Sequence, residues 1–203
     1  ATSRHSRKLK RGNLVSNAFR IIVRDVPEQA QLDRKLRQRI DTLRECGVPN
    51  YFGAQRFGRD CGNLHSADAL LAGRIRVRDR QKRGLYLSAA RSYLFNLILS
   101  ARVEDNSWQQ KTDDGRDPSG PLYGSGHKGY PEESALLAGM QSWCEGLQRF
   151  GLKQSRRALL MGVAELSCVL NPPDQLELRC KLQKGCYATS LLREIVSLQE
   201  NDG

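Results

Sequence analysis

The stretch VAELSCVLNPPDQLELRCKL, residues 163–182, places the strongest constraint on the fold. Its first half, 163–170, is apolar enough to form a buried strand. From 175 to 182 leucine and cysteine alternate with polar residues, which is typical of a strand with one buried face. The Asn-Pro-Pro sequence at 171–173 supplies a turn between the two halves. The sequence therefore predicts an antiparallel β-hairpin near the end of the chain.

The rest of the chain divides into one further strand, several helices and a long loop. The Ile- and Val-rich segment 17–26 predicts the strand. Apolar residues spaced three and four apart predict helices at 27–46, 65–73, 87–101, 132–150 and 188–199. The polar, Gly- and Pro-rich segment 103–131 predicts a loop. Strands at both ends and helices between them favour an α+β domain with a helical insertion.

Composition narrows the class of partner. The 203 residues are 39% hydrophobic and 27% charged, as in ordinary soluble proteins. No apolar run reaches the roughly 18 residues that cross a bilayer, so no membrane association is expected. The net charge of +11 arises from 33 basic and 22 acidic residues. Such an excess favours a phosphate backbone as partner, although it also suits an anionic surface or solubility alone.

The cysteines and histidines do not form a metal-binding pattern. Six cysteines are spread along the chain without a Cys-x-x-Cys pair, and the three histidines stand apart from them. We therefore expect no metal site, and no disulfide framework. Reduced, mostly buried cysteines in a cytoplasmic protein are the expectation.

The segment GVPNYFGAQRFG, Gly47–Gly58, carries the most informative chemistry. Its glycines and proline exclude a regular helix or strand and permit tight turns. It combines three polar side chains with three aromatic rings: Asn50, Gln55 and Arg56, and Tyr51, Phe52 and Phe57. An unstacked nucleobase needs an aromatic face to stack on, an amide to read its edge and a cation for the adjacent phosphate. The alternative is that the rings only fill the protein core.

Two clusters of basic residues are candidates for contact with an RNA backbone. One precedes the first strand and one leads into the long helix. They comprise Arg4, Arg7, Lys8, Lys10 and Arg11, and Arg74, Arg76, Arg78, Arg80, Lys82 and Arg83. Solvated charge without a ligand is the alternative for both.

Four stretches in this order resemble the TruD family of tRNA pseudouridine synthases. They are SRHSRKLKRGNLVSNAF at 3–19, GVPNYFGAQRFG at 47–58, VRDRQKRGLYLSAARSYLFN at 77–96 and GCYATSLLREI at 185–195. The resemblance implies an isomerase that converts a uridine of tRNA, commonly uridine 13, to pseudouridine with an aspartate and no cofactor. It also implies that the nucleotide leaves the helix stack.

The resemblance further implies a fold and a set of site residues. The expected fold is a mixed-sheet pseudouridine synthase core, at 1–75 and 162–203, interrupted by a mainly helical TruD insertion domain at 76–161. The substrate-contacting residues of the family match Asn50, Phe52 and Tyr187, where phenylalanine is expected at the third position. Arg56 and the basic residues Arg4, Arg7, Lys8, Lys10, Arg11, Arg78, Arg80, Lys82 and Arg83 are the expected RNA contacts.

One family segment has no counterpart in the sequence. The catalytic aspartate of the family lies in Gly-x-Lys-Asp-Arg-x-Ala-Val-Thr-x-Gln, which does not occur among the 203 residues. Asp79 stands in a superficially similar context but aligns with another part of the family. We therefore expect the aspartate on a missing N-terminal segment of the same protein, and this chain alone to be inactive. A non-catalytic RNA-binding module on the same fold is the alternative, favoured if the gene upstream encodes no such motif.

Overall fold

The chain forms two compact units, each described here by itself. The computed structural model describes residues 15–26, 30–111, 115–126, 131–171 and 173–196. One unit combines the described residues up to Gly47 with Gly162–Ala188, and the other combines Val48–Met161 with those from Thr189 onward. The three-part domain division expected from the sequence stays a prediction.

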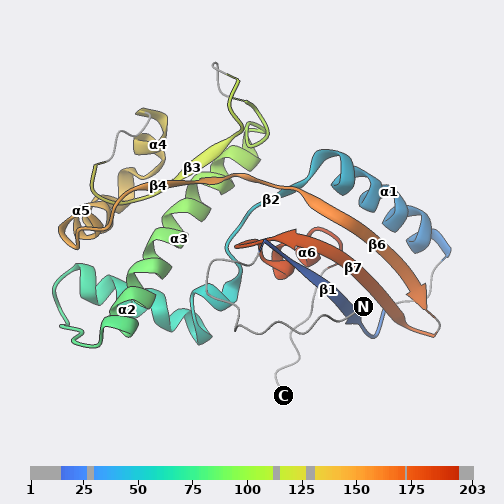
Figure 1. Ribbon diagram of the computed structural model, residues 1–203, viewed down its shortest axis with the longest axis horizontal. Coiled ribbons are helices and arrows are strands. Elements are labelled where there is room, and N and C mark those ends of the chain that lie inside the picture. Colours follow the sequence, from blue (N-terminus) through green and yellow to red (C-terminus); the bar gives the residue numbers. More distant parts are fainter. Residues whose placement is uncertain (1–14, 27–29, 112–114, 127–130, 172, 197–203) are drawn as a thin grey trace, which may run out of the picture. The chain divides into compact units, whose positions relative to one another are not determined.

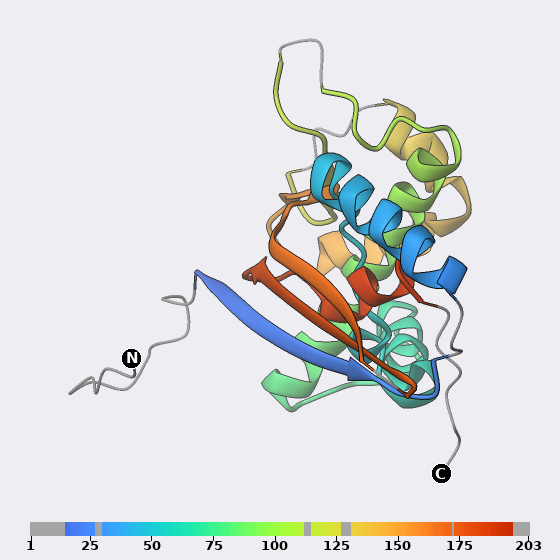
Figure 2. The same ribbon diagram turned by 90° about the vertical axis from the view of Figure 1, so that its right-hand side faces the viewer.

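The first unit is a three-stranded sheet with one long helix (Figure 1). Its elements are β1 (Ser16–Val23), α1 (Ala30–Cys46), β6 (Val163–Asn171) and β7 (Gln175–Gln183). The strand order is β1-β7-β6 and both pairs are antiparallel, as the turned view in Figure 2 shows. The predicted hairpin, the first strand and the helix that follows it are confirmed.

Alternation in β7 creates the core of this unit. Leu176, Leu178, Cys180 and Leu182 are all at most 3% exposed, whereas the residues between them are more accessible. On α1 the apolar residues recur every three or four positions and are buried, at Leu36, Ile40 and Leu43. Burying each such side chain contributes about 1.5–3 kcal/mol.

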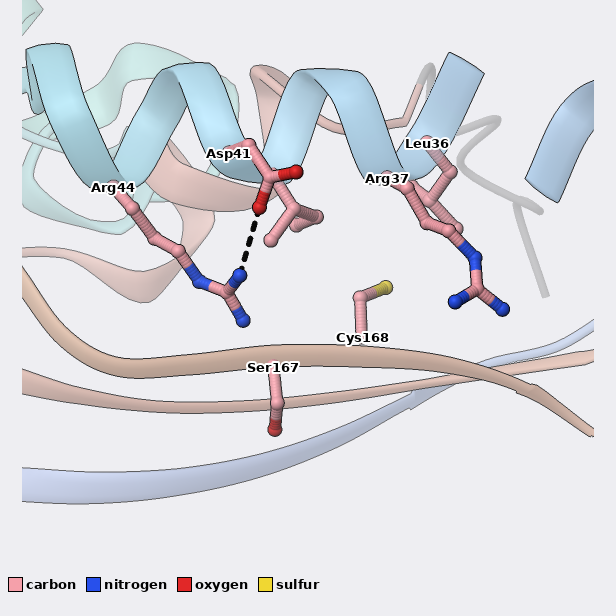
Figure 3. A pocket seen from close by; sticks show the side chains of 7 residues that line it. Leu36, Arg37, Asp41, Arg44, Ser167 and Cys168 are labelled. Carbon is pink, nitrogen blue, oxygen red and sulfur yellow. Dashed lines mark hydrogen bonds and ion pairs between the residues drawn. The ribbon is translucent and has the colours of Figure 1, made fainter. Parts of the chain in front are cut away.

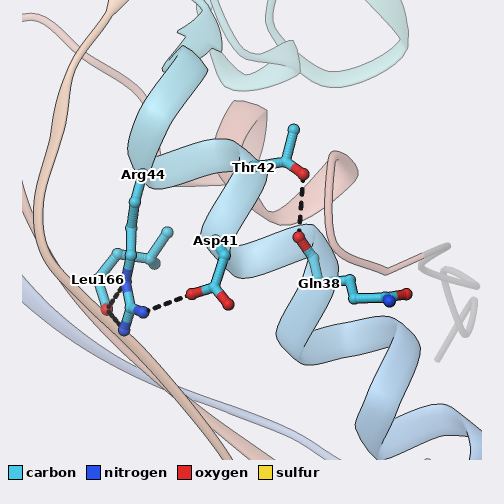
Figure 4. Close-up of polar contacts among 5 residues, drawn as sticks. All are labelled: Gln38, Asp41, Thr42, Arg44 and Leu166. Atoms are coloured by element: carbon cyan, nitrogen blue, oxygen red, sulfur yellow. Dashed lines mark hydrogen bonds and ion pairs between the residues drawn. The ribbon is translucent and has the colours of Figure 1, made fainter.

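A bulge in β6 is used to tie α1 to the sheet. The register with β7 shifts between Ala164 and Ser167. Within the bulge, the Leu166 carbonyl accepts hydrogen bonds from Nε and Nη2 of Arg44 at 3.0 and 2.6 Å (Figure 4). Nη1 of the same arginine donates to Asp41 at 2.8 Å. One guanidinium thus holds a strand carbonyl and a helix carboxylate together.

The second unit is mainly helical. Its elements are β2 (Val48–Pro49), α2 (Gly62–Leu71), α3 (Arg80–Glu104), β3 (Ser119–Leu122), α4 (Pro131–Leu136), α5 (Gln141–Arg149), β4 (Ser155–Ala158), β5 (Leu160–Met161) and α6 (Ala188–Arg193), whose first residue belongs to the other unit. Leu71 of α2, Leu94 and Ile98 of α3 and Leu147 of α5 are buried in one apolar cluster. The predicted helices at 65–73 and 87–101 are confirmed.

Two predictions for this unit need correction. The segment 103–131 is not entirely loop, because β3 lies within it and pairs antiparallel with β4. The helix expected at 132–150 is interrupted by a 3₁₀ turn at Ala138–Met140, where Gly139 lowers helix propensity. Leu137, next to this turn, is buried at 3% exposure, whereas Leu136 is 42% exposed. The last helix ends at Arg193, and 197–199 lie outside the described residues.

The fold class is α+β with small antiparallel sheets, as expected in outline. The mixed sheet of the expected core stays a prediction. None of the six cysteines is in a disulfide. Only Cys144 and Cys180 are buried, however, and Cys46 and Cys61 are exposed, so the expectation of mostly buried cysteines is wrong. Within the described ranges, no helix combines the length and apolarity needed to cross a membrane.

Candidate RNA-binding site

The segment Gly47–Gly58, called the signature segment below, has a short strand near its start and continues as turns. β2 pairs with β5 through Val48↔Met161 and Pro49↔Leu160. Beyond Pro49 the backbone has no regular strand or α-helix until α2 begins, and 3₁₀ turns occupy Ala54–Arg56 and Arg59–Cys61. Gly58 has φ of 82°, where a side chain is strained, and an added Cβ would lie 3.0 Å from the Asn63 side chain. The irregular conformation expected from the sequence is therefore observed beyond Pro49, whereas Val48–Pro49 form a short strand.

Asn50 is buried and its amide is bonded at both ends. It is 5% exposed. Nδ2 donates to the Ala158 carbonyl at 2.9 Å, and Oδ1 accepts from Nη2 of Arg157 at 2.5 Å. The Asn50 backbone carbonyl also accepts from Nε and Nη2 of this arginine, at 3.3 and 3.2 Å. The amide therefore has a defined orientation.

Phe52 is also buried, at 6% exposure, and rings and cations surround it. Its ring meets Phe95 of α3 edge to face, with centroids 5.5 Å apart and planes at 86°. The Arg157 guanidinium carbon lies 4.1 Å from the ring centroid and that of Arg56 lies 5.5 Å away. The Asn96 side chain holds the Phe52 backbone, accepting from its N–H at 2.9 Å and donating to its carbonyl at 3.0 Å.

Arg56 and Phe57 extend the site toward α3. Arg56 is half-buried and Nε donates to Oγ of Ser92 at 3.2 Å. Phe57 is also half-buried, with its ring edge to face with Tyr93 at 6.3 Å. Asn50, Phe52 and Arg56 thus come together in one unit. Tyr187 is half-buried between β7 and α6 in the other unit, so its place beside them stays a prediction.

Most of the basic residues just before and at the start of α3 face solvent. Arg78, Arg80 and Lys82 are exposed, whereas Arg83 is half-buried and donates to the Val77 carbonyl at 3.5 Å. The candidates Arg4, Arg7, Lys8, Lys10 and Arg11 lie outside the described residues.

Two acidic side chains, Asp79 and Asp68, have hydrogen-bond partners within the protein. Asp79 caps α3, accepting from the backbone N–H groups of Gln81 at 2.7 Å and Lys82 at 3.1 Å. Backbone N–H donation by Lys82 and then Gln81 lowers the pKa of Asp79. Asp68 accepts from Nε1 of Trp143 at 2.8 Å and pairs with Arg74, and these two partners lower the pKa of its carboxyl. Helix capping is thus a sufficient structural role for Asp79.

A cavity in the first unit has a different character. It measures about 320 Å³ between α1 and β6 and is lined by Leu36, Arg37, Ile40, Asp41, Arg44, Ser167 and Cys168 (Figure 3). None of the predicted substrate or RNA contacts lines it. Across the described part of the chain, no group of three or more His, Cys, Asp and Glu side chains could hold a metal ion.

Comparison with known proteins identifies the family. Residues 1–77 match the sequence model for tRNA pseudouridine synthase D (TruD). The tRNA pseudouridine synthase D of Cellvibrio japonicus is 45% identical over 203 residues, covering 97% of this chain and 60% of that protein. That of Methylococcus capsulatus is 40% identical, covering 96% and 63%. This chain belongs to the TruD family. It spans less than two thirds of the length of these relatives.

A solved structure supports the fold. A Methanosarcina mazei protein that bears the TruD name matches with a TM-score of 0.63, covering 91% of this chain and 69% of that one. The sequence identity is only 18%, so this match speaks for the fold alone. The TruD fold therefore extends over both units described above.

One prominent residue of this candidate site was missed by sequence reasoning. Arg157 of β4 contacts both Asn50 and Phe52, although it lies 107 residues from Asn50 in the chain. The only local signal is the pair of adjacent arginines in SRRA at 155–158. Because neighbours on a strand point to opposite faces, such a pair indicates that the two arginines have different partners. That signal does not reveal which segment the second arginine meets.

Proposed function

We propose that the intact protein carrying this chain is a tRNA pseudouridine synthase that isomerises uridine 13 of tRNA. The observation that carries the proposal is the 45% identity, over almost the whole chain, to a protein named tRNA pseudouridine synthase D. The net charge of +11 supports a polyanionic substrate. We place the protein in the cytoplasm, with tRNA as its partner.

The proposed reaction defines what the site must do. The N1–C1′ bond of the uridine breaks, the uracil turns, and a C5–C1′ bond forms while C5 loses a proton and N1 gains one. No net oxidation occurs, so the isomerisation itself requires no redox cofactor. The uracil must leave its stack, and an aromatic partner offsets part of that cost by roughly 1–3 kcal/mol. We assign stacking to Phe52 and Tyr187 and recognition of the uracil to Asn50.

We further propose that the catalytic aspartate lies on another segment of the intact protein, which adjoins this chain on its N-terminal side. This is supported by the absence from the 203 residues of the Gly-x-Lys-Asp-Arg sequence that carries it in the family. The role of Asp79 as a helix cap is consistent with this proposal. Arg56, Arg78, Arg80, Lys82 and Arg83, with the basic residues before β1, are proposed to contact the tRNA backbone.

The test is tritium release from a tRNA transcript labelled at C5 of its uridines. The intact protein should release one equivalent of tritium per tRNA, and a transcript with cytidine at position 13 should release none. Release from both transcripts alike would reject the assignment to uridine 13. No release from any tRNA by the intact protein would reject the enzyme.

The missing aspartate motif also favours one alternative, a non-catalytic RNA-binding module. The two functions are distinguished by incubating the intact protein and the 203-residue chain separately with the same labelled tRNA. The isomerase requires that the intact protein release tritium while the 203-residue chain binds tRNA without releasing any. Turnover by the chain alone would overturn the placement of the aspartate outside it. Binding by both without release would establish the module.

A further inference from the structure

Arg156 and Arg157 are neighbours on β4 that serve different parts of the second unit. Arg156 reaches the fully buried carboxylate of Glu133, with Nη2 to Oε1 at 2.6 Å and Nη1 to Oε2 at 3.2 Å. Arg157 turns toward the signature segment instead. The first arginine stabilises packing around α4, whereas the second contacts the residues proposed to hold the uracil.

The contacts of Arg157 determine the orientation of Asn50. Arginine can only donate hydrogen bonds, so the atom of the Asn50 amide that faces it must be the oxygen. The Ala158 carbonyl can only accept, so the atom that faces it must be the nitrogen. The two partners, adjacent on β4, therefore select one of the two possible orientations of the amide. Without the guanidinium, Oδ1 loses this donor and the Ala158 carbonyl alone orients the amide.

The same guanidinium also determines the environment of the Phe52 ring. Its carbon lies 4.1 Å from the ring centroid, a distance at which a cation is attracted to an aromatic face. Phe95 contacts the ring edge to face and Asn96 holds the Phe52 backbone, so the ring is held from several directions. One planar group thus bridges the two residues proposed to touch the uracil. Arginine suits this place because its flat fork can donate in its plane and stack through its face.

We propose that Arg157 is a positioning residue for pseudouridine formation, which acts by fixing the Asn50 amide and the Phe52 ring as one unit. This proposal rests on the proposed function. Because Arg157 acts through these two residues, its loss should slow the isomerisation of bound tRNA and leave tRNA affinity unchanged. Lysine should not replace it, since an ammonium cannot bridge the Asn50 oxygens and cover the ring together.

The experiment measures single-turnover tritium release by the intact protein with saturating tRNA, together with the Kd for tRNA. Arg157→Met and Arg157→Lys should each slow the rate by about 10- to 100-fold, the loss typical of a small displacement of a reacting group. Asn50→Ala should slow the wild-type protein to a similar degree. In the Arg157→Met background it should add less than about threefold, because coupled residues are not additive.

Arg91 provides the matched control. It is a half-buried arginine of α3 whose Nη2 donates to the carbonyls of Leu122 at 2.6 Å and Lys153 at 3.0 Å, away from the signature segment. Arg91→Met should lower Tm and leave the single-turnover rate at wild-type level. Arg157→Lys retains the charge and stem, so it supplies a folded variant if Arg157→Met is unstable.

Each other outcome overturns a defined part of the account. Additive losses for Arg157→Met and Asn50→Ala would show that Arg157 does not act through Asn50. A weaker Kd and a smaller salt dependence in Arg157→Met would make it a phosphate contact instead. A full rate in Arg157→Lys, or equal rates in Arg157→Met and Arg91→Met, would reject the positioning role. Inactivity of the wild-type protein would instead reject the proposed function.

Discussion

Replacing Phe52 by leucine separates a stacking role from a packing role. Leucine keeps an apolar side chain of similar size but has no flat face. The variant loses the edge-to-face pair with Phe95, worth about 0.5–1.5 kcal/mol, and the contact with Arg157, worth about 0.5–2 kcal/mol. We therefore expect the free energy of unfolding to fall by about 1–3.5 kcal/mol. If the ring also stacks on uracil, the rate should fall by about 5- to 150-fold, from 1–3 kcal/mol of lost stacking.

Phe95→Leu is the control for this experiment. Phe95 is fully buried and is the other half of the same ring pair, so its replacement should reduce stability by a similar amount. It is not proposed to touch the substrate, so at 25 °C its variant should lose clearly less of the rate than Phe52→Leu loses. The assay is single-turnover tritium release by the intact protein, with Tm measured on the same samples. Equal rate losses in the two variants would show that Phe52 is a core residue without a stacking role.

Three further predictions concern charge. Glu133→Gln should lower unfolding free energy by about 2 kcal/mol in urea titrations, because it leaves Arg156, which is about a third exposed, without its buried partner; an unchanged midpoint would contradict this. Hydrogen bonds from Arg20 and then from Arg179 lower the pKa of Glu177 to about 2, from 4.5. The stability that these hydrogen bonds contribute is complete above pH 4.5 and is lost as pH falls toward 2. Glu177→Gln should therefore flatten the pH dependence of the unfolding free energy between pH 4.5 and 2. An equally steep dependence in the variant would refute the assignment. Combined alanine replacement of the exposed basic residues just before and at the start of α3 should reduce the slope of log Kd for tRNA against log salt by about 2–3, and an unchanged slope would exclude backbone contact. These residues are Arg78, Arg80 and Lys82.

Elements specified by their own sequence were predictable. The hairpin of β6 and β7 follows from alternation and an Asn-Pro-Pro turn, and α1 follows from a buried residue every three or four positions. The pairing of β3 with β4 was not predictable, because Gly120 and Pro121 are poor strand formers. The structure explains the glycine, since a Cβ there would lie 3.1 Å from the Phe95 ring and 3.0 Å from Leu159. Tertiary packing, which no local pattern reports, selects that strand.

The candidate site was predictable in its residue types but not in its arrangement. The amides and rings of Gly47–Gly58 were visible as a chemical set, and so was the irregular backbone that carries them. The burial of Asn50 and Phe52 was not, since both offered polar or aromatic groups that an exposed loop could equally present. Arg157 reaches them only because β2 pairs with β5, which is a contact between segments about a hundred residues apart.

A structure of the intact protein bound to tRNA tests the central claim most directly. The account predicts that the uracil of uridine 13 is extruded from its stack and lies against the Phe52 ring, at a stacking distance of about 3.5–4 Å, with the Asn50 amide at its edge. A complex in which Phe52 and Asn50 contact only protein, while the extruded nucleoside binds elsewhere, would contradict it.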